Sequence, residues 1–189
     1  MKRLAVYCGA AMGSDPAHAE LARQLGTRMA ERGIALVYGG GHRGLMGVVA
    51  DAVLAAGGAA FGVIPQALVD LEVAHTGLTE LHIVTNMHER KALMTELTDA
   101  FVAIPGGIGT LDELFEAWSW NALGYHAKPF AMLAEDGFWD DLLAFLDTAS
   151  RSGFISAERR RQLLVARSPD EAIDLLAGAC GVSERKMIW

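Results

Sequence analysis

Short runs of β-forming residues alternate with longer helical stretches along the whole chain, and this alternation restricts the folds open to it. Six β-rich runs and a weaker seventh are separated by stretches in which apolar residues recur every three or four positions. Leu21, Leu25 and Met29 show that spacing in the first stretch. Strands joined by helices pair in parallel through right-handed crossovers. The sequence therefore predicts an α/β protein with an open, mostly parallel sheet of about seven strands and helices on both faces.

The expected boundaries of the strands and helices follow from the apolar pattern and from residues that typically start or end a helix. Asp15 suits the N-cap of the first helix, with Pro16 at its first position and Gly33 just after its end. Pro65–Thr79 joins two strands without a clean helix, and a connection of that length often carries function. Strands are expected at Leu4–Tyr7, Ala35–Tyr38, Ala60–Ile64, Leu81–Val84, Phe101–Ile104, Phe130–Leu133 and Leu163–Val165. Helices are expected near Ala17–Arg32, Leu45–Ala56, His88–Leu97, Leu111–Leu123, Trp139–Ser150 and Asp170–Leu176.

Length and charge exclude several classes of protein. The 189 residues suit one folded unit, so residues 1–180 are expected to form a single domain and residues 181–189 a C-terminal tail. The 16 basic and 23 acidic residues give a net charge of −7, which argues against general affinity for nucleic acid or an anionic membrane. No apolar run approaches the ~18 residues of a membrane span. Two isolated cysteines, Cys8 and Cys180, suit the reducing cytoplasm.

Glycines, cations and carboxylates follow four of the predicted strands at their carboxyl ends. They occur in Cys8–Ala10, Gly39–Gly47, Asn86–Lys91 and Pro105–Glu113. In an open parallel sheet, ligands bind beyond the carboxyl ends of the strands, near the point where the strand order reverses. The sequence therefore predicts a binding site at this edge of the sheet.

The segment after the fifth strand carries the strongest local signal. Gly106, Gly107 and Gly109 lie at a strand-to-helix turn, where the backbone can approach a ligand and free helix amides favour a phosphate. Thr110 could add a hydroxyl donor, but the turn holds no lysine and does not match a nucleoside triphosphatase P-loop. Thr110 and Glu113 also fit a capping box, which would make both residues structural. The closely spaced glycines favour anion binding.

The segment after the second strand has the glycine spacing of the dinucleotide-binding fingerprint. Gly39, Gly41 and Gly44 have the required spacing. That fingerprint also needs an acid roughly 20 residues further on, at the end of the next strand, to hold the ribose. The next strand ends at Gly62–Pro65 without an acid, so a nicotinamide dehydrogenase fits poorly. A glycine loop that packs close to a substrate fits better.

Two cations occupy an unfavourable position after the fourth strand. Arg90 and Lys91 lie in the first turn of a helix, where the helix dipole disfavours positive charge, whereas Glu89 is suited to that position. A residue placed against its local preference, beyond the carboxyl end of a strand, indicates a functional role. The structural alternative is a salt bridge to Glu113, Glu72 or another acid. Arg90 can satisfy both hypotheses, because a guanidinium can bind an acid and a substrate oxygen together.

No metal or cofactor is expected. The six histidines lack the spacing of a metal site. No lysine stands in a setting typical of a pyridoxal phosphate enzyme.

The segment Pro105–Glu113 resembles the P-G-G-x-G-T-x-x-E signature of the Lonely Guy family, cytokinin riboside 5′-monophosphate phosphoribohydrolases often labelled lysine decarboxylases. Asp112 stands where many members have glutamate, a departure that leaves Glu113 in place. The resemblance covers nearly the whole chain except the last dozen or so residues. Its other matching segments are Val6–Gly9, Val37–Gly41, Gly44–Gly47, Glu72–His75, Met87–Lys91 and Trp118–Asn121.

This resemblance implies a Rossmann-like fold, a homodimer, and a small-molecule substrate that is an N6-substituted AMP or AMP itself. It implies that Arg90 and Glu113 are the catalytic pair. The residues that it places near the substrate are Gly40, Gly41, Glu72, Met87, Lys91, Gly106, Gly107, Ile108, Gly109, Thr110, Leu111, Asp112 and Ser119.

Cleavage of an N-glycosidic bond develops positive charge on the ribose, which an ionised carboxylate stabilises. Glu113 could act as an electrostatic stabiliser, a base for water or a transient nucleophile, and Arg90 would keep it ionised and oriented. A non-catalytic nucleotide-binding or carrier protein is the alternative, because glycine loops and phosphate binding suit it equally. Amino-acid decarboxylation is the third hypothesis, and it lacks a recognisable cofactor lysine.

Overall fold

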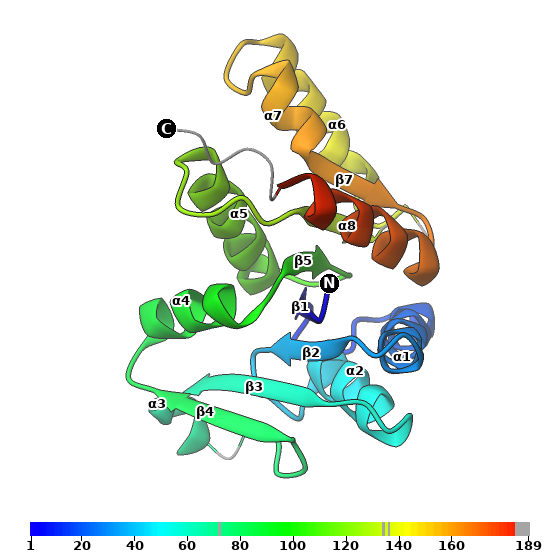
Figure 1. Cartoon of the computed structure of the whole chain (residues 1–189), viewed down its shortest axis with the longest axis vertical. Helices are drawn as coiled ribbons and strands as arrows, with labels where there is room; N and C mark the ends of the chain where they lie inside the picture. Colours follow the sequence, from blue (N-terminus) through cyan, green and yellow to red (C-terminus); the bar gives the residue numbers. More distant parts are fainter. Residues whose placement is uncertain (72, 134, 136, 184–189) are drawn as a thin grey trace.

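Seven strands form one parallel sheet in the order β4-β3-β2-β1-β5-β6-β7 (Figure 1). The computed structural model describes residues 1–71, 73–133, 135 and 137–183. Within these residues every neighbouring pair of strands runs parallel, which confirms the predicted α/β fold. The strands are β1 (Arg3–Tyr7), β2 (Ala35–Tyr38), β3 (Ala60–Pro65), β4 (Glu80–Val84), β5 (Ala100–Ala103), β6 (Phe130–Leu133) and β7 (Leu163–Ala166).

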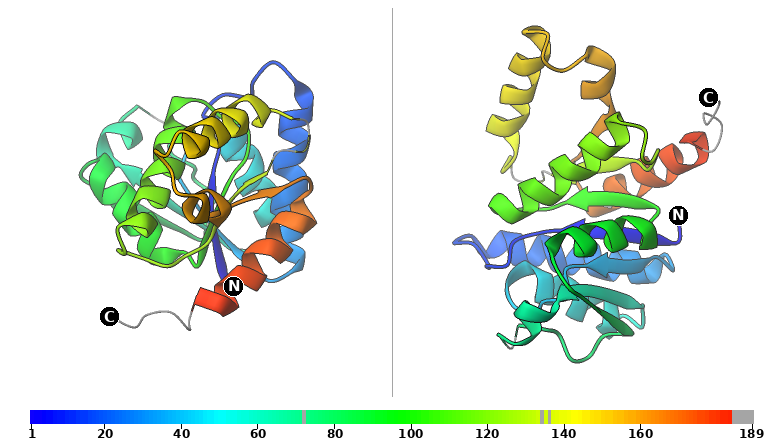
Figure 2. Two further views of the ribbon diagram at one scale, coloured as in Figure 1. Left: turned by 90° about the horizontal axis from the view of Figure 1, so that it is seen from above. Right: turned by 90° about the vertical axis from the view of Figure 1, so that its left-hand side faces the viewer.

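Helices cover both faces of the sheet (Figures 1 and 2). Apolar side chains of α1, α2 and α8 pack together against one face, and those of α4, α5 and α6 pack against the other. The described helices are α1 (Pro16–Glu31), α2 (Gly44–Ala55), α3 (Gln66–Val69), α4 (Met87–Leu97), α5 (Ile108–Ala122), α6 (Asp140–Arg151), α7 (Ala157–Gln162) and α8 (Pro169–Ser183).

Strand β1 shows why the sheet is buried on both faces. Leu4 and Val6 join the core on the side of α1, α2 and α8, whereas Ala5 and Tyr7 join the core on the other side. All four side chains are buried. A parallel strand covered on both faces needs apolar residues at every position, so it reads as a continuous apolar run rather than an alternating one.

The predicted start and end of α1 are confirmed. The carboxylate of Asp15 accepts a hydrogen bond from the amide of Ala17 at 2.9 Å, and Pro16 occupies the first helical position. Gly33 follows the last turn with φ of +66°, a backbone conformation that glycine adopts readily.

Three segments differ from the sequence-based expectation. The connection Pro65–Thr79 contains the single turn α3, which is too short to produce a periodic pattern. Helix α7 is not among the expected helices, because five of its six residues are polar and give no apolar periodicity. Its start is marked mainly by the N-cap Ser156, whose hydroxyl accepts from the amide of Arg159. Helix α8 continues to Ser183, so the first three residues of the expected tail 181–189 are helical. The remaining residues, 184–189, lie outside the described part of the chain.

The strand order reverses beside β1. From β1 the chain adds β2, β3 and β4 on one side, and α4 then carries it back to β5 on the other side of β1 (Figure 1). The connections leaving β1 and β5 therefore diverge to opposite faces and leave an opening between them. The two connections are joined at its base, where the amide of Gly9 donates to the carbonyl of Pro105 at 3.1 Å.

We expect Gly26→Ala in α1 to destabilise the protein by about 1–3 kcal/mol, although alanine is normally the better helix former. The added Cβ would lie 2.6 Å from the carbonyl oxygen of Val49 and 2.9 Å from Cβ of Ala52 on the facing helix α2. Urea unfolding measures the change in the free energy of unfolding.

The matched control is Gly178→Ala in α8, where an added Cβ meets nothing within 4 Å. This variant should be more stable than the parent by about 0.5–1 kcal/mol. Stabilisation by both substitutions would contradict the close α1–α2 packing.

Candidate active site

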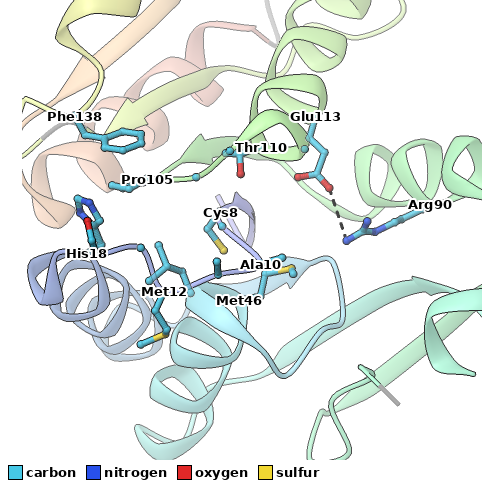
Figure 3. Close-up of a pocket in the computed structure, with 18 residues that line it drawn as sticks. Cys8, Ala10, Met12, His18, Met46, Arg90, Pro105, Thr110, Glu113 and Phe138 are labelled. Carbon is cyan, nitrogen blue, oxygen red and sulfur yellow. Dashed lines mark ion pairs between the residues drawn. The ribbon is translucent and has the colours of Figure 1, made fainter. Parts of the chain in front are cut away.

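A pocket of about 490 Å³ lies where the strand order reverses, beyond the carboxyl ends of β1 and β5 (Figure 3). Its wall is formed by the connections after β1 and β5 and by the starts of α2 and α5. Single side chains from α1, α4 and the segment before α6 complete it. The lining residues are Cys8, Gly9, Ala10, Ala11, Met12, Gly13, Ser14, His18, Leu45, Met46, Arg90, Pro105, Gly106, Gly107, Gly109, Thr110, Glu113 and Phe138.

Arg90 reaches the pocket from α4 and is fixed by the backbone of two strand ends. Its Nε donates to the carbonyl of Val63 and its Nη2 donates to the carbonyl of Gly39, both at 3.1 Å. The side chain is buried, so each of these bonds forms away from water. Gly39 is needed at this point, because a Cβ there would lie 1.8 Å from Arg90 Nη2. The glycines after β2 thus hold a guanidinium in place.

Glu113 faces Arg90 from the second turn of α5 (Figure 3). Its Oε1 lies 3.8 Å from Arg90 Nη2, an ion-pair distance beyond hydrogen-bond length. Burial raises the pKa of Glu113 to about 7, and the neighbouring Asp112 adds to this effect, while Arg90 and Lys91 oppose it. A carboxyl group with this pKa can accept or release a proton near neutral pH, as an acid–base catalyst must.

The first turn of α5 presents backbone amides to the same pocket. The N-cap residue Gly107 has no side chain to cap the helix, and its carbonyl accepts from the amide of Leu111 at 3.1 Å. The amides of Ile108, Gly109 and Thr110 precede that bond and have no intrahelical acceptor. An added Cβ at Gly107 or Gly109 would meet nothing within 4 Å, so this side of the turn is open. Such a helix start attracts an anion.

The capping-box hypothesis for Thr110 and Glu113 is wrong. The helix begins at Ile108, so Thr110 is its third residue rather than its N-cap. The side chain of Thr110 is buried in the wall of the pocket.

Cys8 lines the pocket but is not suited to nucleophilic attack. Burial raises the pKa of its thiol far above the ordinary value, and the charge of Glu113 raises it further. A thiol that stays protonated is a weak nucleophile.

Lys91 is not among the residues that line the pocket. Its ammonium contacts two acids on α5, Asp112 at 3.1 Å and Glu116 at a shorter distance. Burial lowers the pKa of Lys91, but the hydrogen bonds with Glu116 and Asp112 outweigh this and raise it overall.

Three other predicted residues, Met87, Gly40 and Gly41, do not line the pocket but contact Arg90 or belong to the glycine loop after β2. Met87 places its sulfur 3.6 Å from Arg90 Nη1. Gly40 and Gly41 tie the glycine loop to the long connection before β4: the carbonyl of Gly40 accepts from the amide of His75 at 2.8 Å, and Gly41 pairs with Ala74. These residues help to position the wall of the pocket rather than line it.

Three of the remaining predicted residues, Ile108, Leu111 and Ser119, lie on α5. Ile108 is exposed, whereas Leu111 packs against the core. Ser119 lines a separate pocket of about 290 Å³ together with Phe115 and Trp118. Glu72 lies outside the described residues.

The side of the pocket opposite Arg90 was not predicted from the sequence. Met12, Ser14 and His18 come from the connection after β1 and the start of α1, and Phe138 comes from the segment before α6. The rings of His18 and Phe138 meet edge to face with centroids 5.3 Å apart. These positions carry no distinctive motif, and only the position of their segments at the carboxyl edge could have indicated them.

The described residues include neither a membrane-spanning helix nor a cluster of metal-ligating side chains. No helix there has both the length and the apolar composition needed to cross a membrane. In the same part of the chain, no three His, Cys, Asp or Glu side chains are grouped as metal ligands would be.

Comparison with known proteins agrees with this architecture. Residues 46–176 match the family model described as "Possible lysine decarboxylase". A cytokinin riboside 5′-monophosphate phosphoribohydrolase from Oryza sativa subsp. japonica is 44% identical over 100% of this chain and 78% of its own length. One from Rhodococcoides fascians is also 44% identical, over 91% of this chain and 87% of its own. One from Arabidopsis thaliana is 42% identical over 100% of this chain and 90% of its own.

Solved structures share the fold at low sequence identity. The Moco carrier protein from Chlamydomonas reinhardtii has a TM-score of 0.73 at 20% identity, over 96% of this chain and 98% of that chain. The molybdenum cofactor binding protein from Rippkaea orientalis has a TM-score of 0.72 at 22% identity, over 94% and 96%. At this level of identity the likeness concerns the fold alone.

The sheet order, the helical layers and the position of the pocket define a Rossmann-like α/β protein. Within that class the chain belongs to the Lonely Guy family of cytokinin riboside 5′-monophosphate phosphoribohydrolases, as the match to the family model and the identity to these relatives show.

We expect Gly39→Ala to destabilise the protein by about 2–4 kcal/mol in urea unfolding, because it forces the buried guanidinium of Arg90 away from its carbonyl acceptors. Gly41→Ala is the matched control, since its Cβ would lie 3.2 Å from the flexible end of Met46 and at an ordinary contact distance of 3.6 Å from the carbonyl oxygen of Val73. The control should change the free energy of unfolding by less than about 1 kcal/mol. A Gly39→Ala protein as stable as the parent would contradict the placement of Arg90.

Proposed function

We propose that the protein hydrolyses the N-glycosidic bond of N6-substituted AMP, a cytokinin riboside 5′-monophosphate, and also that of AMP. The products are the free base and ribose 5-phosphate. The observation that carries this proposal is the buried Arg90–Glu113 pair in the same pocket as the uncapped start of α5. A site that only binds phosphate gains nothing from an acid near the anion. The relatives that share over 40% identity with the chain carry the name of this activity.

The two halves of the site suit the two ends of a ribose 5-phosphate. The amides at the start of α5, with the helix dipole behind them, would bind the 5′-phosphate. Glu113 lies five residues after Ile108, the first residue of the helix, which corresponds to about 7.5 Å of rise. This spacing is on the scale of a ribose 5-phosphate, so a phosphate at the helix start would place C1′ of the sugar near the carboxylate. Holding both ends in register removes much of the entropic cost of the reaction.

The reaction breaks the bond between C1′ and N9 and forms a bond between C1′ and the oxygen of water. The electron pair of the broken bond leaves with the base, so positive charge develops on the ribose ring in the transition state. The ionised carboxylate of Glu113 would stabilise this charge. As the water oxygen bonds to C1′, Glu113 would take one of its protons, a role that suits its pKa of about 7. The departing base gains a proton from solvent and leaves neutral, and Glu113 returns the proton that it took to solvent, so that one water is consumed.

Arg90 would orient Glu113 and favour its ionised form. Its guanidinium is fixed by Val63 and Gly39, and its charge opposes the effect of burial on the pKa of Glu113. At 3.8 Å it does not occupy Glu113 Oε1 with a hydrogen bond, so that oxygen stays available to water.

Two alternatives fit less well. A non-catalytic nucleotide carrier would use the same fold and phosphate site, but it gives the buried acid no purpose. Amino-acid decarboxylation through pyridoxal phosphate needs a lysine at the cofactor, and the described residues that line the pocket include no lysine.

We further propose that the protein is a cytoplasmic homodimer. Large apolar side chains are exposed at the starts of α4 and α5, where Met87 and Ile108 lie, and just after α5, where Leu123 and Tyr125 lie. A second copy that covered them would remove this surface from water. A cytoplasmic location is supported by a sequence with two isolated cysteines and no disulfide framework.

Liquid chromatography of reactions with AMP, N6-isopentenyl-AMP and the matching nucleosides tests the activity. We expect free base from the monophosphates and little from the nucleosides, because these lack the group that binds the start of α5. Glu113→Gln should still bind AMP in calorimetry but release base at least ~100-fold more slowly. Base release by Glu113→Gln at the parent rate, or robust cleavage of nucleosides, would contradict the mechanism.

Light scattering coupled to size exclusion tests the assembly. We expect a mass twice the 20.2 kDa of the chain. A species of 20.2 kDa at micromolar concentration would contradict the homodimer.

A further inference from the structure

Lys91 follows Arg90 on α4, and the two cations contact different acids of α5. Arg90 faces Glu113, whereas Lys91 contacts Asp112 and Glu116. Asp112 and Glu116 are four residues apart, so they lie on the same face of the helix, one turn from each other. Lys91 therefore spans the turn of α5 that carries Glu113.

The contact between Lys91 and Glu116 is nearly closed to water. The side chain of Lys91 is 12% exposed and that of Glu116 is 19% exposed. Oε1 of Glu116 is buried and has no hydrogen-bond partner among the described residues. A buried carboxylate is costly unless a cation compensates it. In the part of the chain that the structure describes, Lys91 is the only cation that forms an ion pair with Glu116.

Charges of both signs surround Glu113. Burial raises its pKa, Arg90 lowers it, Asp112 raises it and Lys91 lowers it. Glu113 and Glu116 in turn add to the effect of burial in raising the pKa of Tyr7 on β1. The titratable and charged groups around Glu113, from α4, β1 and α5, are Arg90, Lys91, Tyr7, Cys8, Asp112 and Glu116.

We propose that Lys91 is a positioning residue for the reaction. It holds Asp112 and Glu116, fixes the turn of α5 that carries Glu113, and balances the two acids beside that catalytic group without contacting the nucleotide. This inference rests on the proposed function. It gives Lys91 a role different from the substrate contact that the resemblance implied, because the ammonium is already bound by two acids and is not among the pocket-lining residues.

The test compares the pH dependence of kcat/KM in the parent and in Lys91→Met, with base release from AMP as the readout. Without the ammonium, the acidic limb of the profile should move up by about one pH unit. At pH 7 kcat should fall about fivefold while KM stays within about twofold, because a positioning residue acts on the ionisation of Glu113 rather than on substrate affinity.

Two further variants isolate the charge balance. Lys91→Arg keeps the cation and should return the acidic limb to within about 0.3 unit of the parent. The double variant Lys91→Met, Glu116→Gln removes the cation together with its buried partner and should bring the limb at least halfway back. If Lys91→Met does not fold, the double variant is compared with Glu116→Gln alone, and the loss of Lys91 should again move the limb upward.

A substrate contact by Lys91 would give the opposite pattern. In that case Lys91→Met raises KM tenfold or more, leaves the acidic limb in place, and is not rescued in the double variant. This result would overturn the inference.

Failure of the proposed function is separable from failure of this inference. If the parent releases no base from any nucleotide, thermal melts of the parent and Glu113→Gln report the ionisation of Glu113 instead. Because folding raises the pKa of Glu113, the parent loses stability relative to Glu113→Gln as pH rises from the ordinary pKa of 4.5 and levels off above about 7. In a Lys91→Met background the levelling-off should move up by about one pH unit. If the stability difference levels off at the same pH with and without Lys91, the proposed role of Lys91 is overturned.

Discussion

The guanidinium of Arg90 connects three parts of the molecule at one point. Two of its nitrogens donate to the carbonyls of Val63 and Gly39, which belong to neighbouring strand ends, and it faces Glu113 on α5. The backbone carbonyls already hold the guanidinium in place. Facing the carboxylate therefore costs it no further side-chain entropy, whereas a mobile surface side chain loses entropy when it forms an ion pair. The carboxylate is buried beside a charge that does not bind it directly, and this is the condition for a pKa near 7.

The rest of the fold places this pair beside a binding site for an anion. The reversal of strand order at β1 opens the pocket, and the bond between Gly9 and Pro105 sets the width of its base. The same turn that follows β5 starts α5, so the helix that offers amides to a phosphate also carries Glu113. One short segment, Pro105–Glu113, thereby supplies both the phosphate end and the reacting end of the site.

Features that depend on local chemistry could be predicted from the sequence. The alternation of strands and helices gave the sheet, Asp15 and Pro16 gave the start of α1, and the glycines after β5 indicated the open helix start. Features that depend on contacts between distant segments could not be predicted. The role of Gly39 requires the position of Arg90, 51 residues away, and Thr110 looked like a cap because the true first residue of α5 lies two positions earlier. His18 and Phe138 reach the pocket only through the packing of their elements.

The most direct test of this account is a carbon-13 NMR titration of the glutamate side-chain carboxyl groups, with the signal of Glu113 assigned by its loss in Glu113→Gln. The account predicts a midpoint near 7, because burial outweighs the charge of Arg90. A midpoint at or below the ordinary value of 4.5 would contradict it. Such a value would mean that the carboxylate is solvated or fully neutralised by Arg90, and that the site holds no group able to exchange a proton with water at neutral pH.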